Sequence, residues 1–489
     1  MIPTTSRHLR HQFLSNVVTL SFYSYLGESM RIICAELFGT ACHNPGSVGW
    51  NSADWAPCTT APGITSGEGG AMFTDLPANL LGCFLMGLLV SGRDVTVGTT
   101  KLPSVDLPVA LLPQNHVLQQ WTVTHFGLRT GLCGSLTTFA SWNVQMVQMI
   151  CGQLVIQRSQ WVSALFGYLV GWMVALQAYH VGTHVAVMIH RQTNPILAQE
   201  ANHYRMQQEQ LGIMVHRDLP DLERRFLHNF EVKLDEIIDV SKVALLQAWK
   251  DQTIPYRGGA FWVDLQEIEQ AVLVRDEEPR SELLEVARNA GWDVAKLREW
   301  KRYSKEERSS ETSVIAAAAG DNNKAFLAET QLHGTLFFVT SCLLVWGFVS
   351  LSQQQQAPYV TYRDNFLSTL LSPCGTLLRW KLSHWNGRIT RKHWEWLPIG
   401  TLAANLLATT ISALAAALAL QTTDPTFIMW ERAIKTGVAG SLSTVSTYVA
   451  ETSCLLQALP RHAWGYYYSI GSLVLACCFG VVSYVWAVV

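Results

Sequence analysis

Charged side chains are scarce in most of this sequence. Only 15% of its 489 residues are Asp, Glu, Lys or Arg, while 49% are hydrophobic and the mean hydropathy is +0.16. Residues 191–329 hold most of the charged residues, so the rest of the chain is strongly depleted of charge. Ordinary soluble enzymes carry more charge than this. The composition therefore indicates a protein that spans a membrane and carries one soluble insert.

Sequence signatures of catalysis and ATP use are also missing. The chain has no GxxxxGK[ST] motif, and nothing in it resembles a catalytic triad or a cluster of metal ligands. We therefore expect no enzyme, and we expect passive flow down a gradient. The charged segment is nearly balanced between acidic and basic residues, which argues against nucleic acid as a partner. The expected surroundings of the remaining chain are a lipid bilayer.

Apolar runs long enough to cross a bilayer occur about nine times, since a span needs roughly 20 mostly apolar residues. The first and sixth of these runs are weaker, because each has charge within or beside it. The runs are residues 14–38, 71–91, 123–150, 161–189, 335–351, 366–382, 397–420, 433–456 and 463–489.

Basic residues predict the orientation of these spans, because Lys and Arg concentrate in cytoplasmic loops. Placing the N-terminus with Arg7 and Arg10 in the cytoplasm also places the charged segment there. The loop at residues 39–70 then lies outside, and it has no Lys or Arg. This loop holds Cys42 and Cys58, which an oxidising compartment could join in a disulfide or leave free.

The chain repeats itself. Residues 76–88 (LPANLLGCFLMGL) match 402–414 (LAANLLATTISAL), and residues 129–142 (RTGLCGSLTTFASW) match 435–448 (KTGVAGSLSTVSTY). Each repeat has four spans, with one unpaired span between the repeats. Because four crossings return the chain to its starting side, the additional crossing turns the second repeat upside down in the membrane.

The predicted fold is therefore an all-α membrane protein with an inverted-topology repeat of two four-helix units. The predicted domains are residues 1–190 (first four-helix unit), 191–330 (cytoplasmic charged helical insert), 331–359 (linking transmembrane helix) and 360–489 (second four-helix unit).

A weaker match pairs residues 25–31 (YLGESMR) with residues 373–379 (PCGTLLR), and each segment ends in an arginine. Arg31 is expected toward the outer end of its helix and Arg379 toward the cytoplasmic end of its own. Long basic side chains near helix ends extend to the membrane surface at little cost. Snorkelling is therefore the expected role of both arginines.

Two asparagines occupy matching places within the second spans. Asn79 aligns with Asn405, and an unpartnered amide in hydrocarbon is costly. One interpretation is hydrogen bonding between closely packed helices. The other interpretation is a site shared by the two repeats, which the matching positions favour.

The third span of each repeat combines glycines with hydroxyl residues. Gly134 and Gly440 are each the second of a glycine pair, and such helices can break. Carbonyls freed at a break are tolerated within a membrane only where protein or a cavity surrounds them, and carbonyls from two inverted copies could meet around a small cation. Simple close packing through glycine is the alternative.

Beyond the glycines, each third span carries a polar stripe and aromatic neighbours. Glu451 lies on the second stripe, and an ionisable group within a span is a functional candidate, although neutral packing is the alternative. The edges of aromatic rings are partially positive and can attract a small anion without a fixed cation. The aromatic positions are Phe139 and Trp142 in the first repeat, matched by Val445 and Tyr448 in the second.

Together these motifs resemble the Fluc or CrcB fluoride channels, and in particular their fused eukaryotic form, FEX. The resemblance rests on GLCGSLTTFASW, GVAGSLSTVSTY, ANLLG, ANLLA and CGTLLRW, and it covers all but the middle segment. It implies a fluoride-exporting channel in the plasma membrane, formed by a monomer that acts as an internal pseudo-dimer around a structural sodium ion.

The resemblance also implies roles for individual residues. Sodium would be held by the carbonyls of Gly134, Thr137, Gly440 and Ser443. The fluoride paths would be lined by Asn79, Asn405, Phe139, Trp142, Val445 and Tyr448, with a polar track of Thr401, Glu451, Tyr468 and Ser472 in the second repeat.

The two repeats differ at these positions. The first has Asp75 and Gln145 where the second has Thr401 and Glu451. If each path takes one aromatic position from either repeat, Phe139 and Tyr448 form an all-aromatic pair, whereas the other pair contains a valine. We therefore predict one competent path and one degenerate path.

Two other functions stay open at this stage. A secondary transporter could couple fluoride or another small anion to protons through Glu451. A membrane scaffold could instead use the charged middle segment as its working part.

Overall fold

We describe the protein from a computed structural model. The described residues are 4–38, 72–91, 109–112, 116–152, 159–193, 326–387, 394, 396–456 and 463–489. Nearly all of the predicted insert at 191–330 lies outside them, as do Cys42 and Cys58. The domain boundaries, the insert and the disulfide therefore stay predictions.

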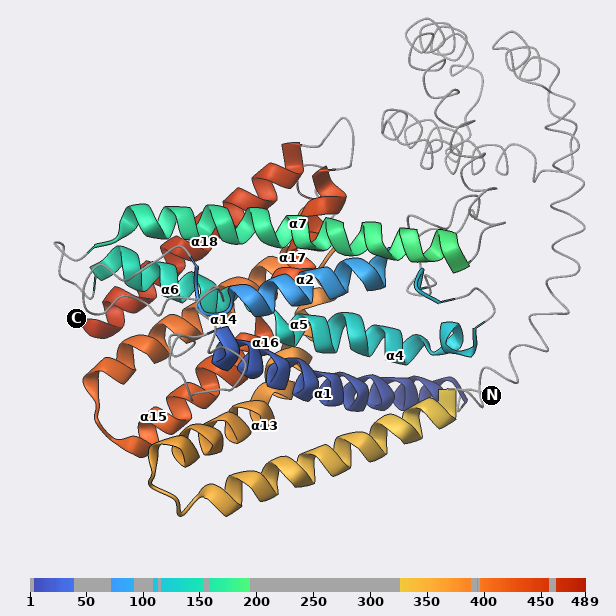
Figure 1. Cartoon of the computed structure of the whole chain (residues 1–489), viewed down its shortest axis with the longest axis horizontal. Coiled ribbons are helices and arrows are strands. Elements are labelled where there is room, and N and C mark those ends of the chain that lie inside the picture. The colour runs from blue at the N-terminus through green and yellow to red at the C-terminus, as the bar shows by residue number, and fades with distance from the viewer. Residues whose placement is uncertain are drawn as a thin grey trace, which may run out of the picture.

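Helices form the regular structure of the described residues, which contain no strand (Figure 1). The first repeat consists of α1 (Thr4–Phe38), α2 (Leu76–Val90), η1 (Val117–Gln120), α4 (Thr122–Phe126), η2 (Gly127–Leu132), α5 (Cys133–Leu136), α6 (Phe139–Cys151) and α7 (Trp161–Thr193). The second consists of α13 (Ala357–Ser383), α14 (Ile399–Leu418), η5 (Ala419–Gln421), α15 (Pro425–Arg432), η6 (Ala433–Ala439), α16 (Gly440–Leu442), α17 (Val445–Leu456) and α18 (Ala463–Val488). The predicted all-α fold class is confirmed.

Four helices among the described residues are long and apolar enough to cross a membrane. They are Trp161–Thr193, Phe326–Leu351, Ile399–Gln421 and Ala463–Val488. The predicted number of about nine spans is therefore not confirmed. The difference has a physical cause, since α1 and α13 carry charged residues, α2 is a shorter apolar helix, and both third spans are divided into pieces.

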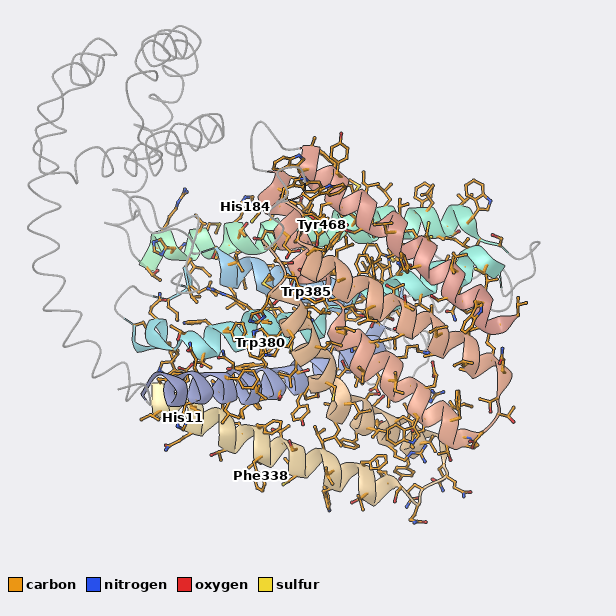
Figure 2. The ribbon with its side chains drawn as sticks, turned by 180° about the vertical axis from the view of Figure 1, so that it is seen from behind. His11, His184, Phe338, Trp380, Trp385 and Tyr468 are labelled. Carbon is orange, nitrogen blue, oxygen red and sulfur yellow. The ribbon has the colours of Figure 1, made fainter. Side chains whose placement is uncertain are left out.

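Helix Phe326–Leu351 lies between the two repeats in sequence and against α1 in space (Figure 1). The Ser15 and Thr330 hydroxyls are 2.8 Å apart, and the Tyr25 and Ser341 hydroxyls are 3.2 Å apart. Since residue numbers rise together along both helices, this helix runs parallel to α1. Its Phe338 side chain is 68% exposed and points away from the bundle (Figure 2), as a lipid-facing residue would.

The first helices of the two repeats, α1 and α13, cross in opposite directions. The Phe13 ring stacks on the Trp380 ring at 5.6 Å, near the start of α1 and the end of α13. At the other end of the pair, the Asn365 amide donates to the Glu36 carboxylate at 3.1 Å. Residue numbers therefore rise on one helix as they fall on the other. The second repeat is inverted relative to the first, as the odd number of linking helices predicts.

Hydroxyl groups join α1 and α13 at the middle of this crossing. The Ser24 hydroxyl lies 3.0 Å from that of Ser372 and 2.8 Å from that of Thr376. The Ser135 hydroxyl of α5 lies 2.7 Å from that of Thr376, so the third span of the first repeat joins the same cluster. These groups are buried, and hydrogen bonding to one another satisfies them without water.

Matching glycines bring the first helix of each repeat onto its own third span. A Cβ atom on Gly27 would lie 2.5 Å from the carbonyl oxygen of Leu132, and one on Gly375 would lie 2.1 Å from that of Val438. Any side chain at either position would overlap the backbone of the third span. Glycine therefore permits the close helix approach that positions the site described next.

Candidate functional site

The third span is broken at the same place in both repeats. In the first repeat, π-helical η2 leads into α5, and the chain then extends at Thr137 (φ −90°, ψ 141°) and Thr138 (φ −133°, ψ 124°) before α6 begins. In the second, π-helical η6 leads into α16, and the chain extends at Ser443 (φ −85°, ψ 161°) before α17. The predicted helix breaks are confirmed, and their π-helical approach is typical of functional segments.

The two matching asparagines hold these breaks within their own repeats. The Asn79 amide accepts from the Thr138 N–H at 2.8 Å and donates to the Thr138 carbonyl at 3.1 Å. The Asn405 amide makes the same pair of bonds with Thr444, at 2.8 and 3.2 Å. Each asparagine therefore satisfies backbone groups that the break would leave unpaired. This bracing leaves one N–H of each amide for another acceptor, so a path-lining role stays a prediction.

Hydroxyl groups at each break cap the next helix of the opposite repeat. The Ser443 hydroxyl accepts from the N–H groups of Phe139 and Ala140, at 3.1 and 3.0 Å. The Thr137 hydroxyl accepts from those of Val445 and Ser446, at 3.2 and 3.1 Å. Helix N-termini need such acceptors, which a neighbouring residue in the same chain segment usually supplies. Here Ser443 and Thr137 supply acceptors across the repeats, while Thr138 and Thr444 accept from the N–H groups of Ser141 and Thr447 within their own repeats.

The two arginines are buried at the breaks, so the predicted snorkelling is wrong. The side chains of Arg31 and Arg379 are 2% and 4% exposed. Arg31 donates to the Thr436 carbonyl of η6 at 2.6 Å, and Arg379 donates to the Thr130 carbonyl of η2 at 2.6 Å. Each arginine thus crosses to the π-helical segment of the opposite repeat. Position along a single helix could not reveal this, because the partner belongs to the other repeat.

Two of the four carbonyls predicted to hold sodium, those of Gly134 and Ser443, meet at one side chain of this junction. Arg379 Nη1 donates to the Gly134 carbonyl at 2.5 Å and to the Ser443 carbonyl at 3.1 Å. The Gly440 carbonyl accepts a hydrogen bond from the Ser443 hydroxyl at 3.3 Å. Carbonyl oxygens suit a hard cation in principle. As arranged, however, these two carbonyls are bound to a guanidinium group, and this arrangement does not fit a sodium ion between them.

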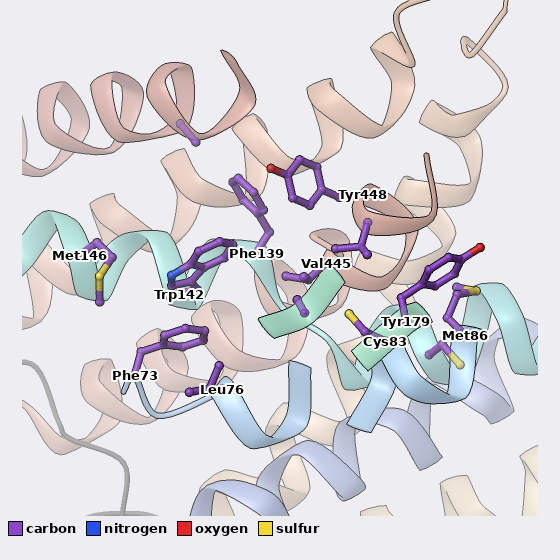
Figure 3. Packing of buried hydrophobic residues seen from close by; sticks show 14 of the residues in the cluster. Phe73, Leu76, Cys83, Met86, Phe139, Trp142, Met146, Tyr179, Val445 and Tyr448 are labelled. Atoms are coloured by element: carbon purple, nitrogen blue, oxygen red, sulfur yellow. The ribbon is translucent and has the colours of Figure 1, made fainter. Parts of the chain in front are cut away.

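The predicted aromatic residues form one buried row. Phe139 lies between Trp142 and Tyr448 (Figure 3), with ring centroids 5.6 and 5.4 Å away and both pairs edge to face. The Tyr448 ring lies 5.5 Å from that of Tyr468. Val445 is buried in the same cluster. The structure therefore brings Phe139 of one repeat against Tyr448 of the other, which is the pairing that the sequence predicts.

The polar track predicted in the second repeat converges on Glu451. The Thr401 hydroxyl and the Tyr468 hydroxyl each donate to the Glu451 carboxylate at 2.7 Å. Ser472 is buried on α18, and its hydroxyl has no hydrogen-bond partner among the described residues. The Ser472 hydroxyl is therefore a buried group that can still donate a hydrogen bond.

Asn386 is a member of this track that the sequence reasoning missed. Its amide nitrogen donates to the Glu451 carboxylate at 3.1 Å, and its amide oxygen accepts from the Gly400 N–H at 2.7 Å. Asn386 precedes Gly387, which has φ of 72°. An Asn-Gly pair is read from sequence as a turn signal, and nothing in the pattern predicts that the turn reaches Glu451.

The corresponding side chains of the first repeat are committed to local bonds. The Ser141 hydroxyl donates to the Asp75 carboxylate, and Gln145 accepts from the Thr74 N–H at 3.1 Å. The Trp142 indole N–H donates to the Gly167 carbonyl at 3.2 Å, and its ring stacks on that of Phe73 at 5.3 Å. These contacts keep Asp75, Gln145 and Trp142 bound to residues of the first repeat.

The fold and the site define a helical membrane protein in which two inverted repeats meet at paired helix breaks. The family model described as "CrcB-like protein, Camphor Resistance (CrcB)" matches residues 19–183 and 366–484, which together are more than half of the chain. The chain therefore belongs to the CrcB family.

Curated relatives named "Fluoride-specific ion channel FluC" are similar to part of the chain. The Desulfovibrio desulfuricans protein is 38% identical over 93 residues (19% of this chain, 67% of the relative), and that of Serratia proteamaculans is 40% identical over 85 residues (17% and 61%). The Salmonella arizonae protein is 42% identical over 92 residues (18% and 66%). The chain thus spans about three fifths to two thirds of their length. No solved structure matches the chain.

Replacing Asn405 by Ala tests the brace at the second break. It leaves the buried Thr444 N–H without a partner, so we expect the free energy of unfolding to fall by about 1–3 kcal/mol. The measurement is thermal unfolding of the purified protein in detergent. Thr409→Val is the matched control, because Thr409 lies one turn further along α14 and its buried hydroxyl has no partner among the described residues. An Asn405→Ala variant as stable as this control would show that the brace is not needed.

Proposed function

We propose that this protein is a passive fluoride channel that exports fluoride through one competent path. Its membership of the CrcB family and the names of its relatives support fluoride as the ion. The observation that carries the single path is the edge-to-face pair of Phe139 and Tyr448, next to the Glu451 track. The other pair of matching positions consists of Trp142 and Val445, so it has only one ring.

The chemistry of this path suits a small, strongly hydrated anion. Such an ion is best moved by a narrow row of donors that replace its water and still release it. The uncommitted Ser472 hydroxyl and the free N–H of Asn405 are donors of this kind, and the ring edges of Phe139 and Tyr448 add weak positive potential. None of these groups is a fixed cation, so none would trap the anion.

Glu451 orients donors within this proposed path. The hydroxyls of Thr401 and Tyr468 both point at its carboxylate, and Asn386 fixes the carboxylate from the turn after α13. A hydroxyl rotates about its C–O bond and can exchange one acceptor for another. The hydroxyls of Thr401 and Tyr468 would therefore donate to a passing anion and donate to Glu451 again after the anion has left.

The second path is proposed to be closed. In the first repeat, Asp75 is bonded to Ser141 and Gln145 to Thr74, so the side chains that would match the Glu451 track are engaged with their own repeat. Trp142 is buried in the same repeat and stacks on Phe73. Packing of this kind excludes both water and ions.

The setting of the channel is also a proposal. Since one chain supplies both inverted repeats, a monomer acting as an internal pseudo-dimer is the functional unit. The distribution of Lys and Arg supports a cytoplasmic N-terminus, and fluoride export is useful at the plasma membrane.

Fluoride efflux from liposomes tests the function itself. Purified protein is reconstituted into vesicles loaded with potassium fluoride, and a fluoride electrode follows release. For a passive channel, efflux begins when valinomycin lets potassium carry the balancing charge, and it needs no proton gradient. Chloride-loaded vesicles serve as the control for selectivity. Efflux that starts only when a proton gradient is imposed would overturn the proposal.

Two substitutions at matching positions test which path conducts. Phe139→Ile removes a ring edge from the aromatic pair, so we expect fluoride efflux to fall at least about tenfold, equivalent to about 1.4 kcal/mol in the barrier. Val445→Ala shortens the matching residue of the closed path and should leave efflux unchanged. Both variants are compared at equal reconstituted protein. The reverse pattern would refute the assignment of the paths.

A further inference from the structure

The guanidinium group of Arg379 lies where carbonyl oxygens of both repeats converge. It donates to the Gly134 and Thr130 carbonyls of the first repeat and to the Ser443 carbonyl of the second. The side chain is buried at 4% exposure. A guanidinium group is planar and carries five N–H donors, so it can donate to several carbonyl oxygens at fixed angles. A spherical ion has no such directional preference and needs its ligands arranged around it. The three carbonyl oxygens therefore suit a guanidinium group in both position and number.

The glycine at this junction gives room to the guanidinium group. A Cβ atom on Gly134 would lie 2.2 Å from Arg379 Nη2 and 2.5 Å from Arg379 Cζ. The matching Gly440 stands in the same relation to Arg31, since its Cβ would lie 2.4 Å from Arg31 Nη1. The paired glycines are thus explained by the approach of two arginines.

The two arginines differ in charge compensation. Arg31 forms a buried ion pair with Glu28 on the same helix. The residue matching Glu28 in the second repeat is Thr376, and its hydroxyl is bonded to those of Ser24 and Ser135. The hydrogen bonds of Arg379 recorded among the described residues go to carbonyl oxygens alone. One positive charge therefore stays at the junction without a carboxylate.

We propose that Arg379 is the resident cation of this junction, in the position that the family resemblance gives to a sodium ion. Its guanidinium joins the two repeats through Gly134 and Ser443, and it supplies the single positive charge that a sodium ion would bring. A second cation on the same carbonyls would be repelled, because like charges interact strongly where water is excluded. The structural sodium predicted from the resemblance is then absent from this protein.

The sodium content of the protein tests this directly and does not depend on fluoride transport. The full chain is purified in potassium buffers from cell lysis onward, and bound sodium is measured by atomic emission. We expect sodium far below one ion per chain, and a melting temperature and fluoride efflux that do not change when sodium is added. Retention of one sodium ion per chain would overturn the proposal. So would a wild-type melting temperature or efflux that depends on sodium.

Variants of two basic residues on α13 give a second test. Arg379→Gln empties the carbonyl set, so the melting temperature in potassium should fall and added sodium should partly restore it. Lys381→Gln is the matched control, since Lys381 is an exposed cation on the same helix, over the Phe13 ring. It should behave as wild type in both salts. An Arg379→Gln variant with wild-type stability and no response to sodium would contradict the proposal. If this variant does not fold, the sodium content of the wild type still decides.

Discussion

Hydrogen bonding of the broken third spans is the constraint on which the rest of this structure depends. Lipid cannot satisfy backbone groups that a helix break exposes, so protein must supply every partner. Within each repeat, an asparagine of the second span holds the residue after the break. Between repeats, Ser443 and Thr137 cap each other's following helices. Each third span is therefore completed only with groups from the opposite repeat, so the two inverted copies stabilise each other.

The two repeats are not symmetric at the charged residues, and the proposal of a single conducting path depends on this difference. Backbone breaks, asparagine braces and hydroxyl caps recur in both repeats almost atom for atom. Glu28 has no carboxylate counterpart beside Arg379, and the acid of the polar track, Glu451, is matched by Gln145. The second repeat consequently keeps a connected row of hydroxyls around its acid, whereas the first commits its polar side chains to local bonds. Two repeats within one chain can differ in this way because their sequences are not required to be identical.

Much of the fold and part of the site follow from the sequence, because repeated motifs report local structure. The inverted repeat, the helix breaks and the meeting of Phe139 with Tyr448 could all be predicted from matching segments and the odd linking helix. The contacts that polar side chains make between the repeats could not be predicted in this way. Snorkelling was expected for Arg31 and Arg379 from their places on single helices, yet each reaches the opposite repeat. The role of Asn386 could not be predicted either, because the Asn-Gly pair predicts a turn but not which residue the turn contacts.

The crossing of α1 and α13 is the contact from which the inverted pairing can be measured most directly. Glu36 near the end of α1 and Asn365 near the start of α13 have side-chain atoms 3.1 Å apart, so cysteines at these two positions are within reach of a short bifunctional thiol reagent only if the helices cross in opposite directions. A protease site placed within residues 191–330 then separates the two repeats. The Glu36→Cys/Asn365→Cys variant, with the native cysteines replaced, is treated with a thiol reagent that contains a reducible disulfide and is then cleaved. We expect the two fragments to migrate together until a reductant is added, whereas each variant with one of these two cysteines yields separate fragments. Separate fragments from the double variant would contradict the inverted crossing.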